Sequence, residues 1–137
     1  MTAVDTNVLV RYLVNDQPQQ AQAARELLNG LSPEEPGFVC REVLLEVVFV
    51  LERAYRFPRG EIANVIEELV STQGLAVESA DDAVQAASHY RQGGAGFSDL
   101  MILAAARRTG ALPVRTFDRA FARLDGALLV EHETETG

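Results

Sequence analysis

Four acidic residues occupy positions where chemistry explains a carboxylate better than folding does. Asp5 ends the short apolar segment at the N-terminus, and Asp118 follows a predicted strand. Asp99 stands at the start of the apolar segment "SDLMILAAA", and Glu46 lies in the middle of "EVLLEVVFVL". Carboxylate oxygens are the ligands that Mg²⁺ and Mn²⁺ prefer. Carboxylates held close together repel each other unless a divalent cation compensates their charge, so the four together predict a metal site.

Glu46 is the most informative of the four. The other residues of the segment 43–51 are all Val, Leu or Phe, which is typical of a helix buried on every side. A buried carboxylate must be neutral, paired or bound to a cation. The structural alternative is a buried ion pair with Arg11 or Arg115. Glu42, one turn earlier, is a rival for the same role, although its place at the helix start also suits the helix dipole.

Each aspartate also has a structural explanation as a helix cap. Asp5 can cap a segment that begins at Thr6, and Asp118 can cap the short helix after it. Ser98 or Asp99 can cap the apolar helix that follows them. Taken one at a time the aspartates therefore indicate little, and the prediction depends on their meeting at one edge of the fold.

The elements that must position these residues alternate along the chain. We expect strands at residues 2–5, 38–40, 75–79, 111–116 and 127–131, and helices at residues 17–30, 41–55, 58–74, 82–91, 98–110 and 118–124. Asp16 is the expected N-cap of the first of these helices. This order predicts an α/β fold in which helices cover both faces of a mostly parallel sheet. Ligands then bind at the carboxyl ends of the strands, where Asp5 and Asp118 are expected.

Composition limits the class of protein further. The chain has 137 residues, 47% hydrophobic and 23% charged, which is typical of one globular domain, and we expect a single domain over residues 1–137. No apolar run is long enough to cross a bilayer, no signal peptide is expected, and Cys40 has no partner for a disulfide, so we expect a cytoplasmic protein. A net charge of −8 argues against binding nucleic acid by a broad basic surface. All basic residues are arginines, which excludes mechanisms that need a lysine.

Four segments in order resemble the PIN-domain nucleases, and within them the VapC-type toxins of toxin–antitoxin pairs. They are "VDTNVLVRYL", "EVLLEVVFVLERAY", "FSDLMILAAA" and "VRTFDRAFARL", and they span nearly the whole chain. The resemblance implies a three-layer α/β/α sandwich with a mostly parallel sheet of about five strands. It also implies an Mg²⁺- or Mn²⁺-dependent endoribonuclease, a homodimer, inhibition by a cognate antitoxin, and contact with DNA only through that antitoxin.

The acidic site of this family falls on Asp5, Glu46, Asp99 and Asp118, the residues chosen above. Asn7 resembles a group that orients the first aspartate, and the expected supporting hydroxyls are those of Thr6, Ser98 and Thr116. Arg11, Arg115 and Arg119 are candidates for contacts with RNA phosphates.

The chain departs from the family pattern at two positions. Cys40 stands where relatives often have a Ser or Thr that can cap the third helix. Gly96 stands where many relatives carry an acidic residue, so that a second metal would bind more weakly here.

The sequence lacks residues that three other classes of protein require, and it leaves two alternative functions open. A haloacid-dehalogenase-type phosphatase needs an aspartate at position 7, where Asn7 stands, and response-regulator receivers and P-loop NTPases need a lysine. Two alternatives remain: an RNA-processing PIN nuclease without an antitoxin, and a catalytically weak PIN domain that serves as a binding module.

Overall fold

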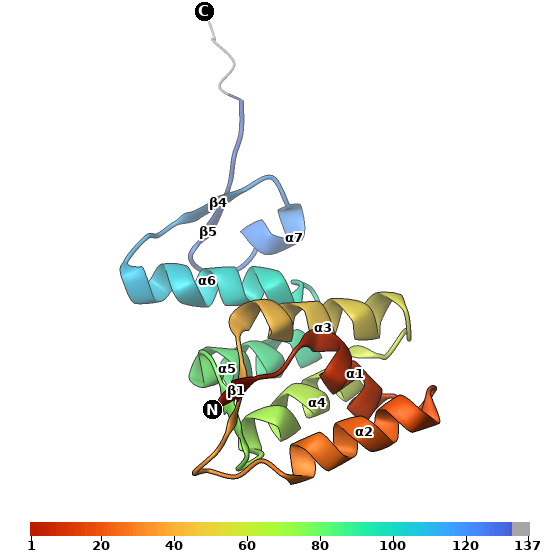
Figure 1. The fold of residues 1–137 in the computed structure, drawn as a ribbon. Coiled ribbons are helices and arrows are strands. Elements are labelled where there is room, and N and C mark those ends of the chain that lie inside the picture. Colours follow the sequence, from red (N-terminus) through yellow and green to blue (C-terminus); the bar gives the residue numbers. More distant parts are fainter. Residues whose placement is uncertain (133–137) are drawn as a thin grey trace, which may run out of the picture.

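The computed structural model describes residues 1–132, and residues 133–137 of the predicted domain lie outside this range (Figure 1). The helices are α1 (Thr6–Leu13), α2 (Pro18–Asn29), α3 (Arg41–Arg53), α4 (Arg59–Ser71), α5 (Ala80–Arg91), α6 (Phe97–Thr109) and α7 (Arg119–Ala122). The strands are β1 (Thr2–Ala3), β2 (Gly37–Val39), β3 (Leu75–Val77), β4 (Val114–Thr116) and β5 (Ala127–Leu129). Strands and helices thus alternate as the sequence predicts.

The strands are parallel and divide between two sheets in the described part of the chain. Strands β1, β2 and β3 form one sheet in that order, with Thr2 opposite Gly37 and Gly37 opposite Leu75. Strands β4 and β5 form the other sheet, with Val114 opposite Ala127. The predicted α/β class with parallel strands is confirmed. The expected single sheet of about five strands is divided, since no ladder joins the two sheets within residues 1–132.

Helix α6 lies between the two parts of the molecule. In Figure 1, β4, β5 and α7 lie on one side of α6, and α3, α4 and α5 lie on the other. We call residues 111–130, which contain β4, α7 and β5, the C-terminal lobe. Asp118 belongs to this lobe and Glu46 to α3, so the two carboxylates come from elements on opposite sides of α6.

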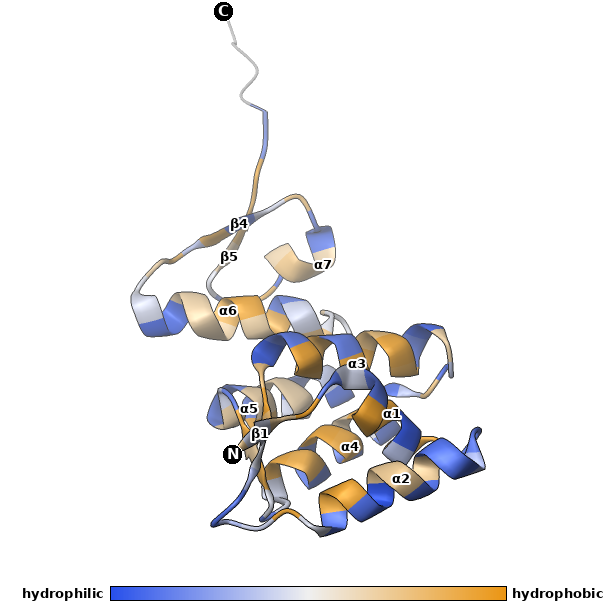
Figure 2. Cartoon of the chain, viewed as in Figure 1, coloured by the Kyte–Doolittle hydropathy of each residue, from blue (hydrophilic) through white to orange (hydrophobic). Residues whose placement is uncertain are grey.

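The hydrophobic core lies beneath α6 and is built from amphipathic helices. Figure 2 shows hydrophobic and hydrophilic residues side by side on the same helices. In α4 the buried side chains of Ile62, Ile66 and Leu69 follow the helical period that the sequence predicts. The first turns of α6 contribute Phe97 and Met101 to the same cluster. The core therefore anchors the start of α6, where Asp99 lies.

The helix ends agree with the sequence in part. Gly110 ends α6 in the left-handed conformation at φ 71°, which glycine adopts without strain. The prediction that Asp16 caps α2 is wrong, because Gln17 is the cap residue and Asp16 accepts a hydrogen bond from the Tyr55 hydroxyl at 2.7 Å. Cys40 precedes α3 and makes no capping bond with its side chain. The carboxylate of Glu78, beyond the end of β3, accepts the Arg41 amide at 2.8 Å instead.

Arg59, the first residue of α4, holds the loop that leads into α6. Its guanidinium donates to the carbonyl oxygens of Tyr90 at 3.0 Å, Ala95 at 2.9 Å and Gly94 at 3.2 Å. It also lies 4.4 Å from the centroid of the Tyr90 ring, and that ring meets the edge of Phe97 with 6.0 Å between centroids. These contacts satisfy carbonyls at the end of α5 and fix the approach to Asp99.

We expect Arg59→Ala to lower the free energy of unfolding by about 2 kcal/mol, because carbonyls at the end of α5 lose a charged donor. Urea unfolding followed by circular dichroism measures the change. The matched control is Arg25→Ala, because Arg25 makes one exposed hydrogen bond at 3.4 Å on its own helix. The control should change stability by less than about 0.5 kcal/mol. Equal losses in the two variants would contradict a special role for Arg59.

Candidate functional site

Asp5 lies where β1 ends and α1 begins. Val4 is buried and pairs with β2, and Asp5 itself is exposed. One oxygen of the Asp5 carboxylate accepts the Thr6 amide at 2.7 Å, so the side chain caps α1. The apolar strand therefore stops at the charge, as the sequence predicts, and the carboxylate keeps its other oxygen free of the helix.

Thr6 connects Asp5 to Glu46. It is the one polar residue classed as buried in the part of the chain that the structure describes. Its amide donates to Asp5, and its hydroxyl donates to Glu46 Oε2 at 3.0 Å across 40 positions of sequence. A single buried residue thus fixes carboxylates from α1 and α3 relative to each other.

The prediction that Glu46 is buried is wrong. Helix α3 buries Leu44, Val47, Val48 and Leu51 on one side, and Glu46 is exposed on the other. Phe49 on the same helix is also 56% exposed, although a phenylalanine in such an apolar segment more often packs in the core. The reason is that α3 packs against α1, α4 and α6 but leaves one side to an open groove. The structural alternative, an ion pair of Glu46 with Arg11 or Arg115, is not found within residues 1–132, where Glu46 accepts a hydrogen bond from Thr6.

Asp99 and Asp118 form the second pair of carboxylates. Burial raises the pKa of Asp99, and the negative charge of Asp118 raises it further, while a backbone hydrogen bond at Gly96 lowers it. Asp118 is held in place by local bonds: one oxygen accepts the Phe121 amide at 3.0 Å, and its own amide donates to the Thr116 hydroxyl at 3.0 Å. The repulsion within this pair is a cost that a bound cation would relieve.

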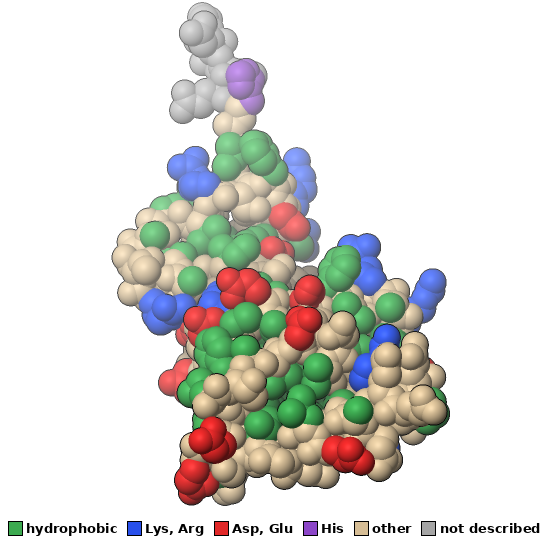
Figure 3. Space-filling view, viewed as in Figure 1, with side chains coloured by type: hydrophobic (Ala, Val, Ile, Leu, Met, Phe, Trp, Pro, Cys, Tyr) green, Lys and Arg blue, Asp and Glu red, His purple; other side chains and the backbone are tan. Residues whose placement is uncertain are grey.

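An open groove contacts Glu46 and the residues just before Asp99, whereas Asp5, Asp99 and Asp118 are not among its lining residues. It has a volume of about 590 Å³ and runs between α3 and the first residues of α6. Glu42, Glu46, Phe49 and Ser98 are among its lining residues. Figure 3 shows acidic side chains gathered where the C-terminal lobe meets the body of the molecule. The groove is therefore acidic, and Glu42 lies beside Glu46 as the rival carboxylate.

The donor set suits Mg²⁺ or Mn²⁺, although the described residues do not form a complete metal cage. No three or more His, Cys, Asp or Glu side chains within residues 1–132 are grouped closely enough to hold an ion by themselves. Magnesium commonly binds one or two protein carboxylates together with waters and substrate phosphates. The exposed carboxylates and the repelling pair Asp99–Asp118 fit that mode of binding.

Gly96 leaves room beside Asp99. A Cβ atom at position 96 would lie 3.6 Å from Asp99 Oδ2, which is an ordinary van der Waals contact. A side chain at this position would thus lie against the carboxylate of Asp99. Glycine adds no ligand there, and the weaker binding of a second metal stays a prediction.

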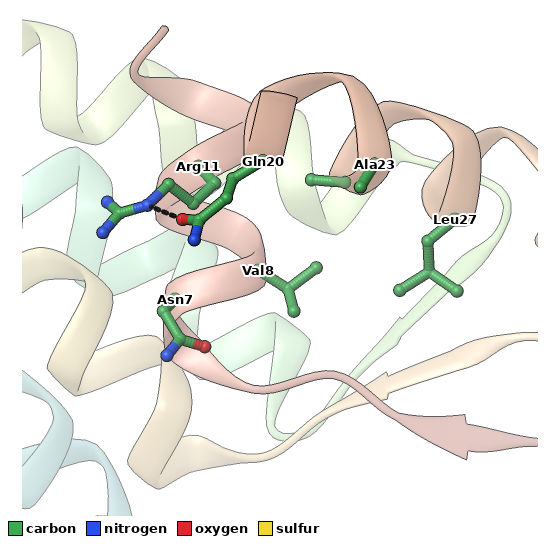
Figure 4. Close-up of a pocket in the computed structure, with 7 residues that line it drawn as sticks. Asn7, Val8, Arg11, Gln20, Ala23 and Leu27 are labelled. Carbon is green, nitrogen blue, oxygen red and sulfur yellow. Dashed lines mark hydrogen bonds between the residues drawn. The ribbon is translucent and has the colours of Figure 1, made fainter. Parts of the chain in front are cut away.

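Asn7 and Arg11 lie in a different pocket. This pocket, of about 390 Å³, is formed by α1 and α2, and Figure 4 shows Asn7, Val8 and Leu27 around it. Arg11 donates to Gln20 Oε1 at 2.6 Å (Figure 4). Asn7 makes no hydrogen bond to Asp5 among the described residues, since Thr6 makes that contact, so its orienting role stays a prediction.

Arg115 and Arg119 lie on either side of Asp118 and are exposed. Sequence reasoning missed Phe117 between them, which is 80% exposed. The only signal was an aromatic residue between two arginines in "RTFDR".

Comparisons with known proteins identify the family of this chain. Residues 2–127 match the sequence model of the PIN domain. The chain is 28% identical over 125 residues to a VapC ribonuclease of Aquifex aeolicus, an alignment covering 90% of this chain and 92% of that protein. It is 30% identical over 126 residues to Ribonuclease VapC23 of Mycobacterium tuberculosis strain CDC 1551 / Oshkosh, covering 89% of this chain and 96% of that protein.

We expect Thr6→Val to lower the free energy of unfolding by about 1–2 kcal/mol, because Glu46 loses its donor while the shape of the side chain is kept. Thr6→Ser is the matched control, since it keeps the hydroxyl. Denaturant unfolding of the three proteins measures the difference. A valine variant as stable as the wild type would show that the hydrogen bond contributes nothing to the fold.

We expect Asp99→Asn to raise the melting temperature at neutral pH with a chelator present. The pKa of Asp99 is raised on folding, so the folded state binds its proton more strongly than the unfolded chain does. The penalty is present above the folded pKa and disappears as the pH falls towards 3.8, the unfolded value. The gain should shrink over that range in thermal unfolding. An undiminished gain at acidic pH would rule out this cause.

Proposed function

The chain belongs to the PIN domain family, and from that premise we propose that it is an endoribonuclease that hydrolyses RNA phosphodiesters with Mg²⁺ or Mn²⁺. The observation that carries the proposal is the link from Asp5 through Thr6 to Glu46 at the acidic groove. The VapC ribonucleases of similar sequence favour RNA as the substrate.

Each carboxylate has a role in this proposal. Asp5, Glu46, Asp99 and Asp118 hold one or two cations, directly or through water. When bound, a divalent cation lowers the pKa of water and neutralises charge that develops on a phosphodiester. Thr6 binds the carboxylates of Asp5 and Glu46, Thr116 fixes the backbone amide of Asp118, and Ser98 lines the groove with Glu46. The expected products carry a 5′-phosphate and a 3′-hydroxyl.

In this proposal arginine side chains bind the RNA on either side of the cleaved bond. Arg115 and Arg119 lie next to Asp118 in sequence and are exposed, so they suit contacts with phosphates near the cleaved bond. Arg11 bonds to Gln20 in the pocket between α1 and α2, which leaves it a less direct candidate.

We further propose that the enzyme is the toxin of a type II toxin–antitoxin pair, acting in the cytoplasm as a homodimer inhibited by its antitoxin. Its resemblance to VapC ribonucleases over 89–90% of its length supports this role. In the described residues no helix is long and apolar enough to cross a membrane. DNA contact would come through the antitoxin, because the chain itself is acidic.

One observation favours the alternative of a catalytically weak binding module. Within residues 1–132 no three metal-ligating side chains already stand together, so the cation site depends on water or substrate for its remaining ligands. Titration with Mn²⁺ in a calorimeter separates the two functions. Absence of both Mn²⁺ binding and RNA cleavage at high protein concentration would favour the module.

We expect Asp5→Asn to reduce RNA cleavage by about 100-fold or more, because it removes a charged ligand from the site. The amide can still accept the Thr6 amide proton, so the melting temperature should change little. Glu34→Gln is the matched control, since Glu34 is exposed and lies outside the groove. EDTA should abolish cleavage and added Mg²⁺ or Mn²⁺ restore it. Wild-type cleavage by Asp5→Asn would refute the assignment of the site.

A further inference from the structure

Phe117 is displayed on the surface next to a proposed site carboxylate. At 80% exposure it is the most exposed of the large hydrophobic residues in the described chain. It stands between Thr116, at the end of β4, and Asp118. A phenyl ring exposed to this degree beside a proposed site carboxylate is available for contact with a ligand.

The backbone on both sides of Phe117 is fixed. The Thr116 carbonyl accepts the Val130 amide at 2.7 Å, and the Thr116 hydroxyl accepts the Asp118 amide at 3.0 Å. The Asp118 carboxylate in turn accepts the Phe121 amide at 3.0 Å. The ring therefore projects from a rigid turn, and a ligand that stacks on it loses little backbone entropy.

Three arginines lie close to Phe117 in the sequence. Arg115, Arg119 and Arg123 are exposed, and none of them forms an ion pair within residues 1–132. Between positions 114 and 124, Asp118 is the one acidic residue beside them. This local surface is thus cationic on a chain whose net charge is −8. Figure 3 shows basic side chains on both sides of the C-terminal lobe.

We propose that Phe117 is a stacking platform for an unpaired base of single-stranded RNA, and that Arg115, Arg119 and Arg123 bind the phosphates on either side of that base. Bases of single strands stack on aromatic side chains, and arginines beside the ring follow the backbone. Because Asp118 is the next residue, the stacked base lies next to the bond to be cut. This inference rests on the proposed function and narrows its substrate to unpaired RNA.

The charge of the segment 114–124 favours RNA over a second copy of the chain as the ligand of Phe117. In a two-fold symmetric contact the same patch meets itself, so the arginines of both copies would face each other. RNA phosphates complement those arginines instead. An acidic protein partner has the same sign of charge as RNA, and the experiment below distinguishes it.

The test uses the full chain carrying Asp5→Asn, so that bound RNA stays intact. Single-stranded oligoribonucleotides carry the fluorescent base 2-aminopurine, moved one position at a time, because stacking on an aromatic ring quenches its fluorescence. We expect quenching at one position, and Phe117→Ala should abolish it and weaken binding by about tenfold. Phe117→Tyr should retain both, and the same sequence as a duplex should show no dependence on Phe117. Arg123→Ala should lower the slope of log affinity against log salt by about 0.7.

Val84→Ala is the control for loss of an exposed apolar side chain, since Val84 is 39% exposed on α5. It should bind RNA like the parent variant. Unchanged RNA affinity in Phe117→Ala would overturn the inference. A change of its sedimentation instead would identify the ring as a contact between chains or with a protein. Failure of the proposed function is a separate result, namely absence of cleavage by the protein with Asp5 intact.

Discussion

The placement of Asp99, partly buried and within reach of the negative charge of Asp118, is the constraint on which the proposed site depends. Asp99 and Asp118 come from different elements and raise the free energy of the metal-free fold by their proximity. Asp118 is held there by bonds that do not neutralise it: its carboxylate accepts the Phe121 amide, and its own amide donates to the Thr116 hydroxyl. Negative charges that no arginine compensates within residues 1–132 favour a cation as ligand. The same arrangement of carboxylates therefore destabilises the metal-free site and supports the proposed chemistry.

Two of the site carboxylates also act as helix caps. Asp5 caps α1 and Asp118 caps α7, so each aspartate is oriented by the helix that follows it. For Asp5 and Asp118 the structural and functional explanations are therefore compatible in the fold, whereas the expected cap of α6 by Ser98 or Asp99 is wrong, because Gly96 is the cap residue and no side chain caps that helix. One carboxylate oxygen accepts a backbone amide, and the other stays available to a ligand.

A few polar contacts fix the proposed site residues relative to the core. Thr6 places Glu46 beside Asp5, and Arg59 fixes the loop before Asp99 by binding carbonyls at the end of α5. The C-terminal lobe joins the body through α6, since β4 does not pair with β1 in the described chain. The lobe carries the exposed arginines Arg115, Arg119 and Arg123, while α3 brings its acidic residues, together with Arg53, to the groove.

The sequence by itself determined the order of the elements and the local role of Asp5 and Asp118, because caps, helical periods and strand ends depend on neighbouring residues. It did not determine the exposure of Glu46. A run of valines and leucines is typical of a buried helix, but only packing decides which side stays open. The contact of Thr6 with Glu46 and the cap that Glu78 supplies to α3 join residues about 40 positions apart. Such contacts, like the division of the strands into two sheets, depend on how the elements pack, and therefore only the tertiary structure decided them.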